Sequence, residues 1–278
     1  MFISNMKRIV AVVFALCLAA GAYAQTQTVR AFSHRGGRLE RDENTAIAFQ
    51  ESWDAGYTGF ETDIRMTKDG VLYLTHDHTL ERTTNGTGIF EEKTSAEIEK
   101  LRTKKGNKLM SFEEFCQFLD GKENLYVEFE FKTKPVDLYP QERLEEYVEK
   151  IYKRVRKIRT KNSQFVFTSS DYRGLRYLQE HHPDAELLLI IGKPINDETI
   201  AMAKTVGIYT LGCKTDGTSR AMVEKAHKEG ITVSLWPSLT VEDFVLAVYL
   251  GADRLCCDIP VTLKQFMDEK MPWVKVVY

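Results

Sequence analysis

The alternation of two kinds of segment along the chain constrains the fold more than any other feature of the sequence. From residue 30 onward, short runs of β-branched and aromatic residues alternate with longer segments of helical period. This is the pattern of βα units, whose strands lie parallel in one sheet. Strand-like runs lie at residues 30–34, 59–65, 124–132, 164–168, 186–190, 208–211, 232–236 and 254–257. Eight strands and a chain of 278 residues fit one closed barrel, so we predict an α/β TIM (β/α)8 barrel.

The predicted helices follow most of these strands, and several of them begin after an Asn, Asp, Ser or Thr cap. They occupy residues 44–55, 144–159, 172–180, 197–204, 219–229 and 241–249. One stretch breaks the alternation, because a strand-like run at 71–75 is followed by a polar segment without a clear βα unit. We therefore predict a small insertion between barrel strands two and three, at about residues 79–108, within a single domain covering residues 25–278.

The first residues have the features of an export signal. Lys7 and Arg8 precede an apolar run at residues 9–20, and Ala-Tyr-Ala at 22–24 has the small-x-small pattern of a cleavage site. We predict a signal peptide at residues 1–24 and export, to the periplasm. The apolar run is too short to span a bilayer comfortably, so we expect no stable membrane insertion. Lipid attachment at Cys17 is an alternative, but a bulky Leu16 stands where such sites have a small residue.

Charge and cysteine content exclude two classes of function. A net charge of −2 provides no broad basic field for a nucleic-acid backbone, so we expect no nucleic-acid partner. After residue 24 the cysteines are Cys116, Cys213, Cys256 and Cys257. Their spacing forms neither a dense disulfide framework nor a CxxC metal site, so we expect core thiols.

Acidic residues share one face of two predicted barrel strands. Glu61 and Asp63 are two residues apart, as are Glu128, Glu130 and Lys132, so each set points to one side of its strand. Buried acids repel one another unless a cation neutralises them, and an all-oxygen set suits Ca²⁺ or Mg²⁺ better than Zn²⁺. A solvated edge strand is the alternative, but the same pattern on two strands favours a site.

Two histidines follow strand-like runs, at the positions where barrel enzymes keep their chemistry. His34 ends the first strand and is followed by Arg35, and His76 closes the run at 71–75. Imidazoles can act as acid and base near neutral pH, and a guanidinium offers a fork of donors for an anionic oxygen. A cation, basic groups and two histidines together are what phosphodiester cleavage requires.

These residues lie in segments that closely resemble the glycerophosphodiester phosphodiesterase family. The matching segments, in order and with similar spacing, are residues 34–36, 43–45, 59–63, 67–70 and 76–84. Weaker matches continue at residues 130–132, 167–171 and 251–260, so the resemblance covers nearly all of the chain after the predicted signal peptide.

The resemblance implies a role for each of the candidate site residues. Glu61, Asp63 and Glu130 would hold the metal, His34 and His76 would be the acid/base pair, Arg35 and Lys132 would contact phosphate, and Trp236 would wall the alcohol side of the pocket. Glu43 is expected to support the site and Asn44 to cap the first helix. Glu128 stands where relatives often have Asn, so it could join the metal ligands.

The function implied by the resemblance is metal-dependent hydrolysis of small-molecule glycerophosphodiesters to an alcohol and glycerol 3-phosphate, with one divalent cation, Ca²⁺ or Mg²⁺. The nucleophile is either water or the glycerol 2-hydroxyl, and we favour His34 as the acid and His76 as the base. An exported phosphodiesterase acting on lysophospholipids or wall polymers is one alternative. A non-catalytic phosphate-binding barrel is another, but every expected catalytic position is filled.

Overall fold

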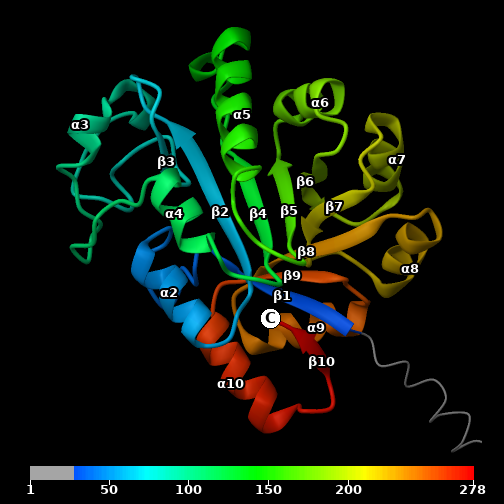
Figure 1. Cartoon of the computed structure of the whole chain (residues 1–278). Coiled ribbons are helices and arrows are strands. Elements are labelled where there is room, and N and C mark those ends of the chain that lie inside the picture. Colours follow the sequence, from blue (N-terminus) through cyan, green and yellow to red (C-terminus); the bar gives the residue numbers. More distant parts are fainter. Residues whose placement is uncertain (1–27) are drawn as a thin grey trace, which may run out of the picture.

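The computed structural model describes residues 28–278, in which eight parallel strands close into a barrel (Figure 1). The barrel strands are β1 (Thr28–His34), β2 (Gly59–Met66), β4 (Tyr126–Phe131), β5 (Gln164–Ser169), β6 (Glu186–Pro194), β7 (Thr210–Lys214), β8 (Thr232–Ser238) and β9 (Arg254–Cys257). Each pairs in parallel with its neighbours, and β1 closes the barrel by pairing with both β2 and β9. The predicted TIM barrel is therefore confirmed.

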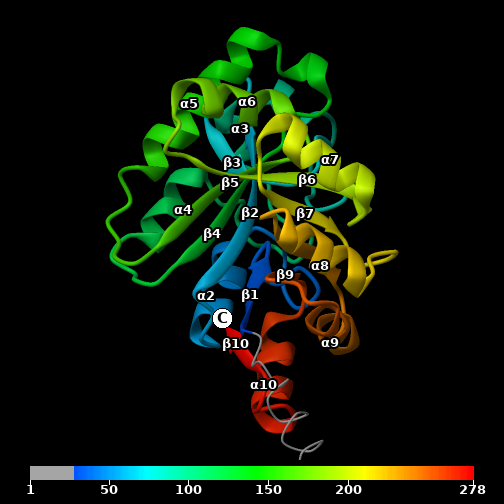
Figure 2. The ribbon, with the colours of Figure 1, turned by 90° about the vertical axis from the view of Figure 1, so that its right-hand side faces the viewer.

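Helices surround the barrel (Figure 2). They are α2 (Ala46–Asp54), α4 (Phe112–Leu119), α5 (Gln141–Val155), α6 (Tyr172–His181), α7 (Asp197–Val206), α8 (Arg220–Lys228), α9 (Val241–Leu250) and α10 (Pro260–Lys270). The sequence patterns did not predict α4 and α10. A capping box marks the start of α4, where Ser111 and Glu114 bond each other's backbone N–H groups, and a proline opens α10.

The predicted cap of the first helix is wrong by one residue. Thr45, not Asn44, is the N-cap of α2, and its hydroxyl accepts a hydrogen bond from the Ala48 N–H. Asn44 lies before the helix with a φ of 58°, a left-handed conformation that asparagine tolerates better than most residues. This conformation leaves the Asn44 side chain free to turn toward β2.

The segment between β2 and β4 forms a small subdomain beside the barrel. It contains β3 (Leu72–Leu74), antiparallel to β2, the short 3₁₀ helix η1 (Phe90–Glu92) and α3 (Ser95–Ile98). Five buried side chains make its own small core: Tyr73, Leu80, Phe90, Ile98 and Leu109. The stretch predicted as an insertion thus includes η1 and α3.

Apolar packing separates the barrel interior from the layer between barrel and helices. The larger core fills that outer layer, whereas Phe32, Tyr126, Val166, Leu188 and Cys256 form a separate cluster from five strands. Phe32 and Tyr126 are two residues before His34 and Glu128, so the interior cluster and the candidate site share the inner face of the strands. The apolar cluster thus adjoins the polar groups of the candidate site.

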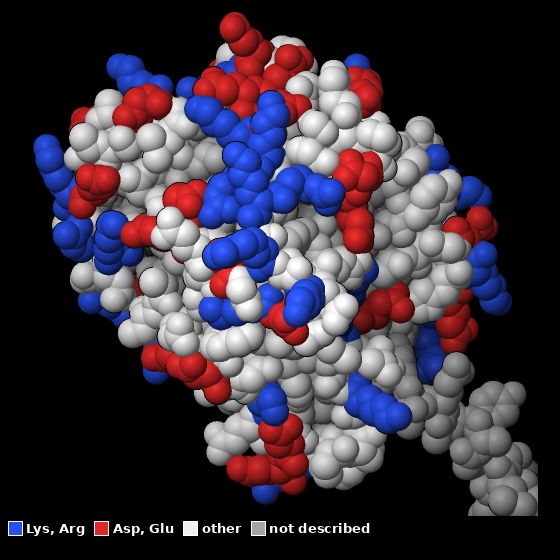
Figure 3. Space-filling model, viewed as in Figure 1, with Lys and Arg blue, Asp and Glu red and all other residues white. Residues whose placement is uncertain are grey.

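The last strand of the chain, β10 (Lys275–Val277), pairs in parallel with the first residues of β1. Basic side chains gather over the middle of the face seen in Figure 3 and are bordered by acidic ones. Within residues 28–278, no helix is both long and apolar enough to cross a membrane.

Candidate active site

Three buried carboxylates from adjacent strands converge at the barrel mouth. Glu61 and Asp63 lie on β2, and the register of β2 with β4 pairs Asp63 with Glu130. One oxygen from each side chain lies within 4.8 Å of the others. Glu61 Oε1 and Asp63 Oδ1 are buried without a hydrogen-bond partner among the described residues. Buried carboxylate oxygens with unused lone pairs are the donors that a hard divalent cation prefers, so these residues fit the predicted metal.

The two acids on β2 have opposite pKa shifts. Burial raises the pKa of Glu61 well above its ordinary value, and the nearby charges of Asp63 and Glu130 add to this effect. Burial also acts to raise the pKa of Asp63, but Arg35, His76 and Lys132 outweigh it and hold that pKa below its usual range. Without a cation, the two acids on β2 therefore favour an ionised Asp63 beside a protonated Glu61.

Asp63 is fixed by donors from the loop that follows β1. Arg35 Nε lies 3.0 Å from Asp63 Oδ2, and the Asn44 amide donates to the same oxygen at 2.9 Å. Asn44 in turn accepts a hydrogen bond from the Thr62 hydroxyl at 2.8 Å, which fixes the orientation of its amide. Arg35 also contacts Glu43 at 3.1 Å, consistent with the expected supporting position of Glu43. Asn44 thus orients a candidate metal ligand instead of capping a helix.

Each histidine has its Nδ1 atom held by a carboxylate. His34 Nδ1 lies 2.5 Å from Asp258 Oδ1, and His76 Nδ1 lies 2.6 Å from Asp77 Oδ1. Burial and the charge of Arg35 lower the pKa of His34, although Asp258 opposes them. If each Nδ1 carries the proton, the Nε2 atom of each ring is left to exchange protons with a bound molecule.

The candidate residues surround a cavity of about 530 Å³. Both predicted catalytic residues and all three predicted substrate-binding residues line it: His34, His76, Arg35, Lys132 and Trp236. Glu61 and Glu130 line it too, whereas Asp63 is fully buried. Lys132 Nζ lies 2.8 Å from Glu130 Oε1 and 3.5 Å from Asp63 Oδ1, so its ammonium stands between two acids.

Glu128 lies beside this cluster but has other partners. Its Oε1 accepts a hydrogen bond from the Tyr126 hydroxyl. That hydroxyl in turn accepts a hydrogen bond from Arg254 Nη1 at 3.0 Å. Burial raises the pKa of Glu128 to about 7. Glu128 lines the cavity but does not belong to either of the metal-competent groups found among residues 28–278.

Three further residues contribute to the site without having been assigned a role from the sequence. Asp258 follows β9 and binds both His34 and Arg38, the latter at 2.8 Å. Arg82 bridges Glu43 and Asp77 from the insertion and lines the cavity. An acid directly after the last barrel strand is at a site position by the same rule that singled out His34. Arg38 pairs with Asp258, 220 residues away, and Arg82 joins the nearby Asp77 to the distant Glu43, so no local pattern marks either contact across the site.

Comparison with known families agrees with this geometry. The model of the glycerophosphoryl diester phosphodiesterase family matches residues 34–262. The chain belongs to this family. The predicted resemblance and the prediction of a phosphodiesterase of this family are both confirmed.

Relatives within the family match most of the chain. A glycerophosphodiester phosphodiesterase of Caldanaerobacter subterraneus subsp. tengcongensis is 29% identical over 238 residues, which cover 83% of this chain and 94% of that protein. A glycerophosphodiester phosphodiesterase of Bacillus altitudinis is 26% identical over 246 residues, covering 82% and 94%.

Solved structures of similar proteins share the fold. A phosphodiesterase of Oleispira antarctica, in complex with the product sn-glycerol-3-phosphate, has a TM-score of 0.75 at 17% identity and covers 86% of this chain and 97% of its own. A glycerophosphoryl diester phosphodiesterase of Parabacteroides distasonis has a TM-score of 0.67 at 23% identity, covering 88% of each chain.

Proposed function

We propose that this phosphodiesterase hydrolyses glycerophosphodiesters to an alcohol and glycerol 3-phosphate. The observation that carries the proposal is the convergence of three buried carboxylates beside two histidines in one cavity. The complex of the Oleispira antarctica structure with sn-glycerol-3-phosphate supports the same product here.

Glu61, Asp63 and Glu130 would hold one divalent cation, Ca²⁺ or Mg²⁺. When bound, this cation would supply Lewis-acid stabilisation of the negative charge that develops on a phosphate oxygen. Burial raises the pKa of Glu61 and the charges of Asp63 and Glu130 raise it further; the cation would offset this second contribution. Arg35 and Lys132 would bind the remaining phosphate oxygens, which is supported by their position in the cavity lining next to these acids.

The histidines would carry the proton transfers. With Nδ1 held by Asp258 or Asp77, each ring keeps a fixed orientation and presents Nε2. One histidine would take the proton of the nucleophile, either water or the glycerol 2-hydroxyl, and the other would give a proton to the departing alcohol. The assignment of His34 as acid and His76 as base is part of this proposal.

The cavity has a polar side and an apolar side. His76, Asp77 and Arg82 contribute polar groups to its lining, whereas Leu188, Ile190 and Trp236 belong to one apolar cluster and line it from β6 and β8. A small polar alcohol would contact the first group, and an acyl chain would need the second. This apolar side is the observation that keeps lysophospholipids as a second candidate substrate.

The experiment that tests the proposal is hydrolysis of glycerophosphocholine, glycerophosphoethanolamine, glycerophosphoinositol and a lysophospholipid, each with and without chelator. We expect chelation to abolish hydrolysis, because the proposed mechanism needs the cation. Added Ca²⁺ or Mg²⁺ should restore hydrolysis, because both ions prefer oxygen ligands. Full activity in excess chelator after dialysis would rule out the metal-dependent mechanism. Hydrolysis of the lysophospholipid, but of none of the three glycerophosphodiesters, would make lysophospholipids the substrate class instead.

We also infer that residues 1–24 direct export and that the mature enzyme is a single domain from residue 25. This proposal is supported by the basic, apolar and small-residue pattern at residues 7–24, which lies outside the described residues. Fractionation of expressing cells and sequencing of the mature N-terminus test it. A lipid-modified N-terminus at Cys17 would establish the alternative.

A further inference from the structure

Cys256 is the described cysteine that the proposed mechanism leaves unused although it faces the cavity. Of the four cysteines within residues 28–278, all are buried and free, and Cys256 is the one that lines the cavity. Cys256 packs with the barrel-interior cluster and Cys257 with the outer core, because successive residues of a strand point to opposite faces. β9 thus delivers one thiol into the site and keeps its neighbour outside.

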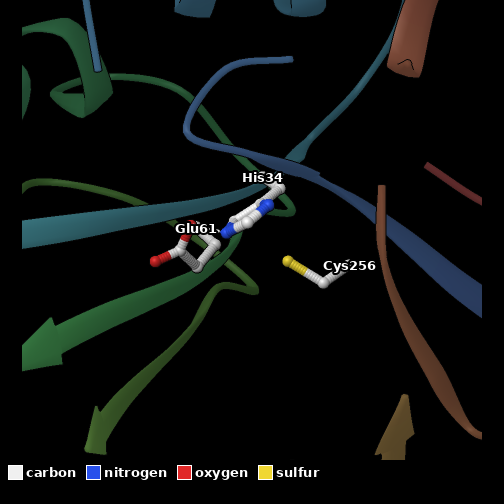
Figure 4. A group of neighbouring side chains, drawn as sticks. All are labelled: His34, Glu61 and Cys256. Atoms are coloured by element: carbon white, nitrogen blue, oxygen red, sulfur yellow. Dashed lines mark ion pairs between the residues drawn. The ribbon is translucent and has the colours of Figure 1, made fainter. Parts of the chain in front are cut away.

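Cys256 lies with His34 and Glu61 in a group able to hold a metal. One donor atom from each of the three side chains lies within 4.8 Å of the others. Figure 4 shows His34 next to Glu61, with the sulfur of Cys256 pointing toward these two side chains. The His34 Nε2 atom lies 3.7 Å from Glu61 Oε2, and Glu61 Oε1 is buried without a hydrogen-bond partner among the described residues. The group therefore combines nitrogen, oxygen and sulfur donors around one point.

His34 is already oriented as a metal ligand. Its Nδ1 atom contacts Asp258 Oδ1 at 2.5 Å, and Arg38 holds the same oxygen of Asp258 at 2.8 Å. A ligating histidine usually donates its other ring N–H to a carboxylate, which fixes the tautomer that leaves the second nitrogen free. The Asp258 contact supplies that arrangement with Nε2 turned toward Glu61.

We propose that His34, Glu61 and Cys256 form a second, inhibitory site for a thiol-binding divalent cation such as Zn²⁺. Zinc accepts Cys, His and carboxylate ligands at about 2.0–2.3 Å, so it would draw the three donors closer together. Its binding would release the thiol proton to solvent and form a zinc–thiolate bond. Ca²⁺ and Mg²⁺ prefer oxygen ligands and would instead favour the site of Glu61, Asp63 and Glu130.

The two sites share Glu61, which explains why zinc would inhibit. Zinc bound by His34, Glu61 and Cys256 would withdraw Glu61 from the site that it forms with Asp63 and Glu130. It would also coordinate the Nε2 atom of His34. Both effects would remove groups that the proposed hydrolysis uses, whereas zinc binding itself does not depend on that function. Ca²⁺ at high concentration should weaken zinc binding, because it competes for the shared carboxylate.

The binding test uses Co²⁺ as a spectroscopic substitute for Zn²⁺ in wild type, Cys256→Ser and Cys257→Ser. We expect sulfur-to-cobalt charge-transfer absorption in wild type and in Cys257→Ser, removed by Zn²⁺ and weakened by excess Ca²⁺. Cys256→Ser, with a circular dichroism spectrum matching wild type, should lack the band. Cys256→Ala serves in its place if the serine variant does not fold. A band of equal strength without the Cys256 thiol, or none in wild type, would overturn the site.

The inhibition test measures hydrolysis against Zn²⁺ at fixed Mg²⁺, with each variant normalised to its own zinc-free rate. Losing even an outer partner of a metal site weakens binding about 10–100-fold, so Cys256→Ser should need at least about tenfold more Zn²⁺ for half-inhibition. Cys257→Ser should follow wild type. Equal zinc sensitivity of Cys256→Ser and wild type would refute the inhibitory role. If no variant hydrolyses any substrate, the proposed function fails, while the cobalt band still decides the site.

Discussion

At the scale of single residues, Lys132 lies between the proposed metal ligands and the cavity in which we propose that phosphate binds. Its ammonium contacts both Glu130 and Asp63, which are candidate ligands, and it also lines the cavity. A positive charge next to a metal site disfavours the cation but favours an anionic substrate. Effects on metal binding and on phosphate binding can therefore be separated by a substitution that removes the charge of Lys132 but keeps an aliphatic side chain of similar length.

We expect Lys132→Met to leave metal affinity unchanged or to raise it, while kcat/KM falls sharply through lost transition-state stabilisation. Glu130→Gln should do the reverse, weakening metal affinity so that activity returns in part at high metal concentration. Calorimetric metal titration alongside steady-state kinetics distinguishes the two. Loss of metal with normal turnover at saturating metal in Lys132→Met would make Lys132 a support for the ligands.

The histidines allow a second residue-level prediction. Because each would exchange a proton with a reacting oxygen, His34→Ala and His76→Ala should each lower kcat by about 10²- to 10⁴-fold. His227→Ala is a matched control, since His227 pairs with Asp253 on the surface, at α8. Rates measured at saturating metal, with circular dichroism of each variant, test this. Wild-type turnover in both site variants would show that the acid/base pair is elsewhere.

At the scale of secondary-structure elements, a buried ion pair ties the insertion to the barrel. Arg65 on β2 contacts Glu91 of η1 at 2.5 Å, and both side chains are less than 5% exposed. Arg65 also donates to the backbone carbonyls of His76 and Lys132, at 2.9 and 3.1 Å. The pair thereby positions two segments that carry site residues.

We expect Arg65→Met to lower the free energy of unfolding by about 3–5 kcal/mol, because it leaves the buried charge of Glu91 without its partner. The double variant Arg65→Met/Glu91→Leu should be less destabilised, since it removes both charges. Chemical denaturation measures these differences. Lys193→Met is the control, because its pair with Glu198 is exposed and should contribute little. A similar loss in the single and the double variant would contradict the role assigned to the buried charge.

At the scale of the whole molecule, we expect the acid cluster to make the free energy of unfolding depend on pH and on cations. The folded-state pKa of Glu61 lies well above its ordinary value, so the folded protein holds a proton that the unfolded chain releases. Above the ordinary glutamate pKa, the metal-free protein therefore loses stability as pH rises, until the folded-state pKa is reached. A bound cation favours the ionised carboxylate and should reverse this loss.

We expect Ca²⁺ or Mg²⁺ at 100 times its dissociation constant to raise the free energy of unfolding by about 2.7 kcal/mol. In chelator, Glu61→Gln should lose less stability than wild type as pH rises, and it should respond weakly to cations. Glu128→Gln is a matched control. The Tyr126 hydroxyl already donates a hydrogen bond to Glu128, so we expect the cation to stabilise this variant as it stabilises wild type. Denaturation at two pH values, with and without cation, measures both effects. Loss of the cation effect in Glu128→Gln would place Glu128 among the ligands.

The barrel and most of the candidate residues could be predicted from local sequence patterns. Strand and helix periods are local, so the order of βα units could be read without any tertiary contact, and the same period placed Glu61, Asp63 and Glu130 on one side of their strands. The sequence patterns did not predict the 8-residue helix α4, although it is amphipathic and has a capping box, because it follows directly on the irregular insertion.

The contacts between groups that are distant in sequence, in contrast, could not be predicted from local patterns. Asp258 lies 224 residues from His34, and Arg65 binds Glu91 across the insertion, so no sequence spacing predicts either contact. Asn44 looked like a helix cap locally, but barrel closure brings β2 beside it and gives its amide a stronger partner in Asp63. Barrel closure also brings Cys256 beside His34 and Glu61. Such contacts depend on which strands become neighbours when the sheet closes, and that is a property of the packed barrel, not of any one segment.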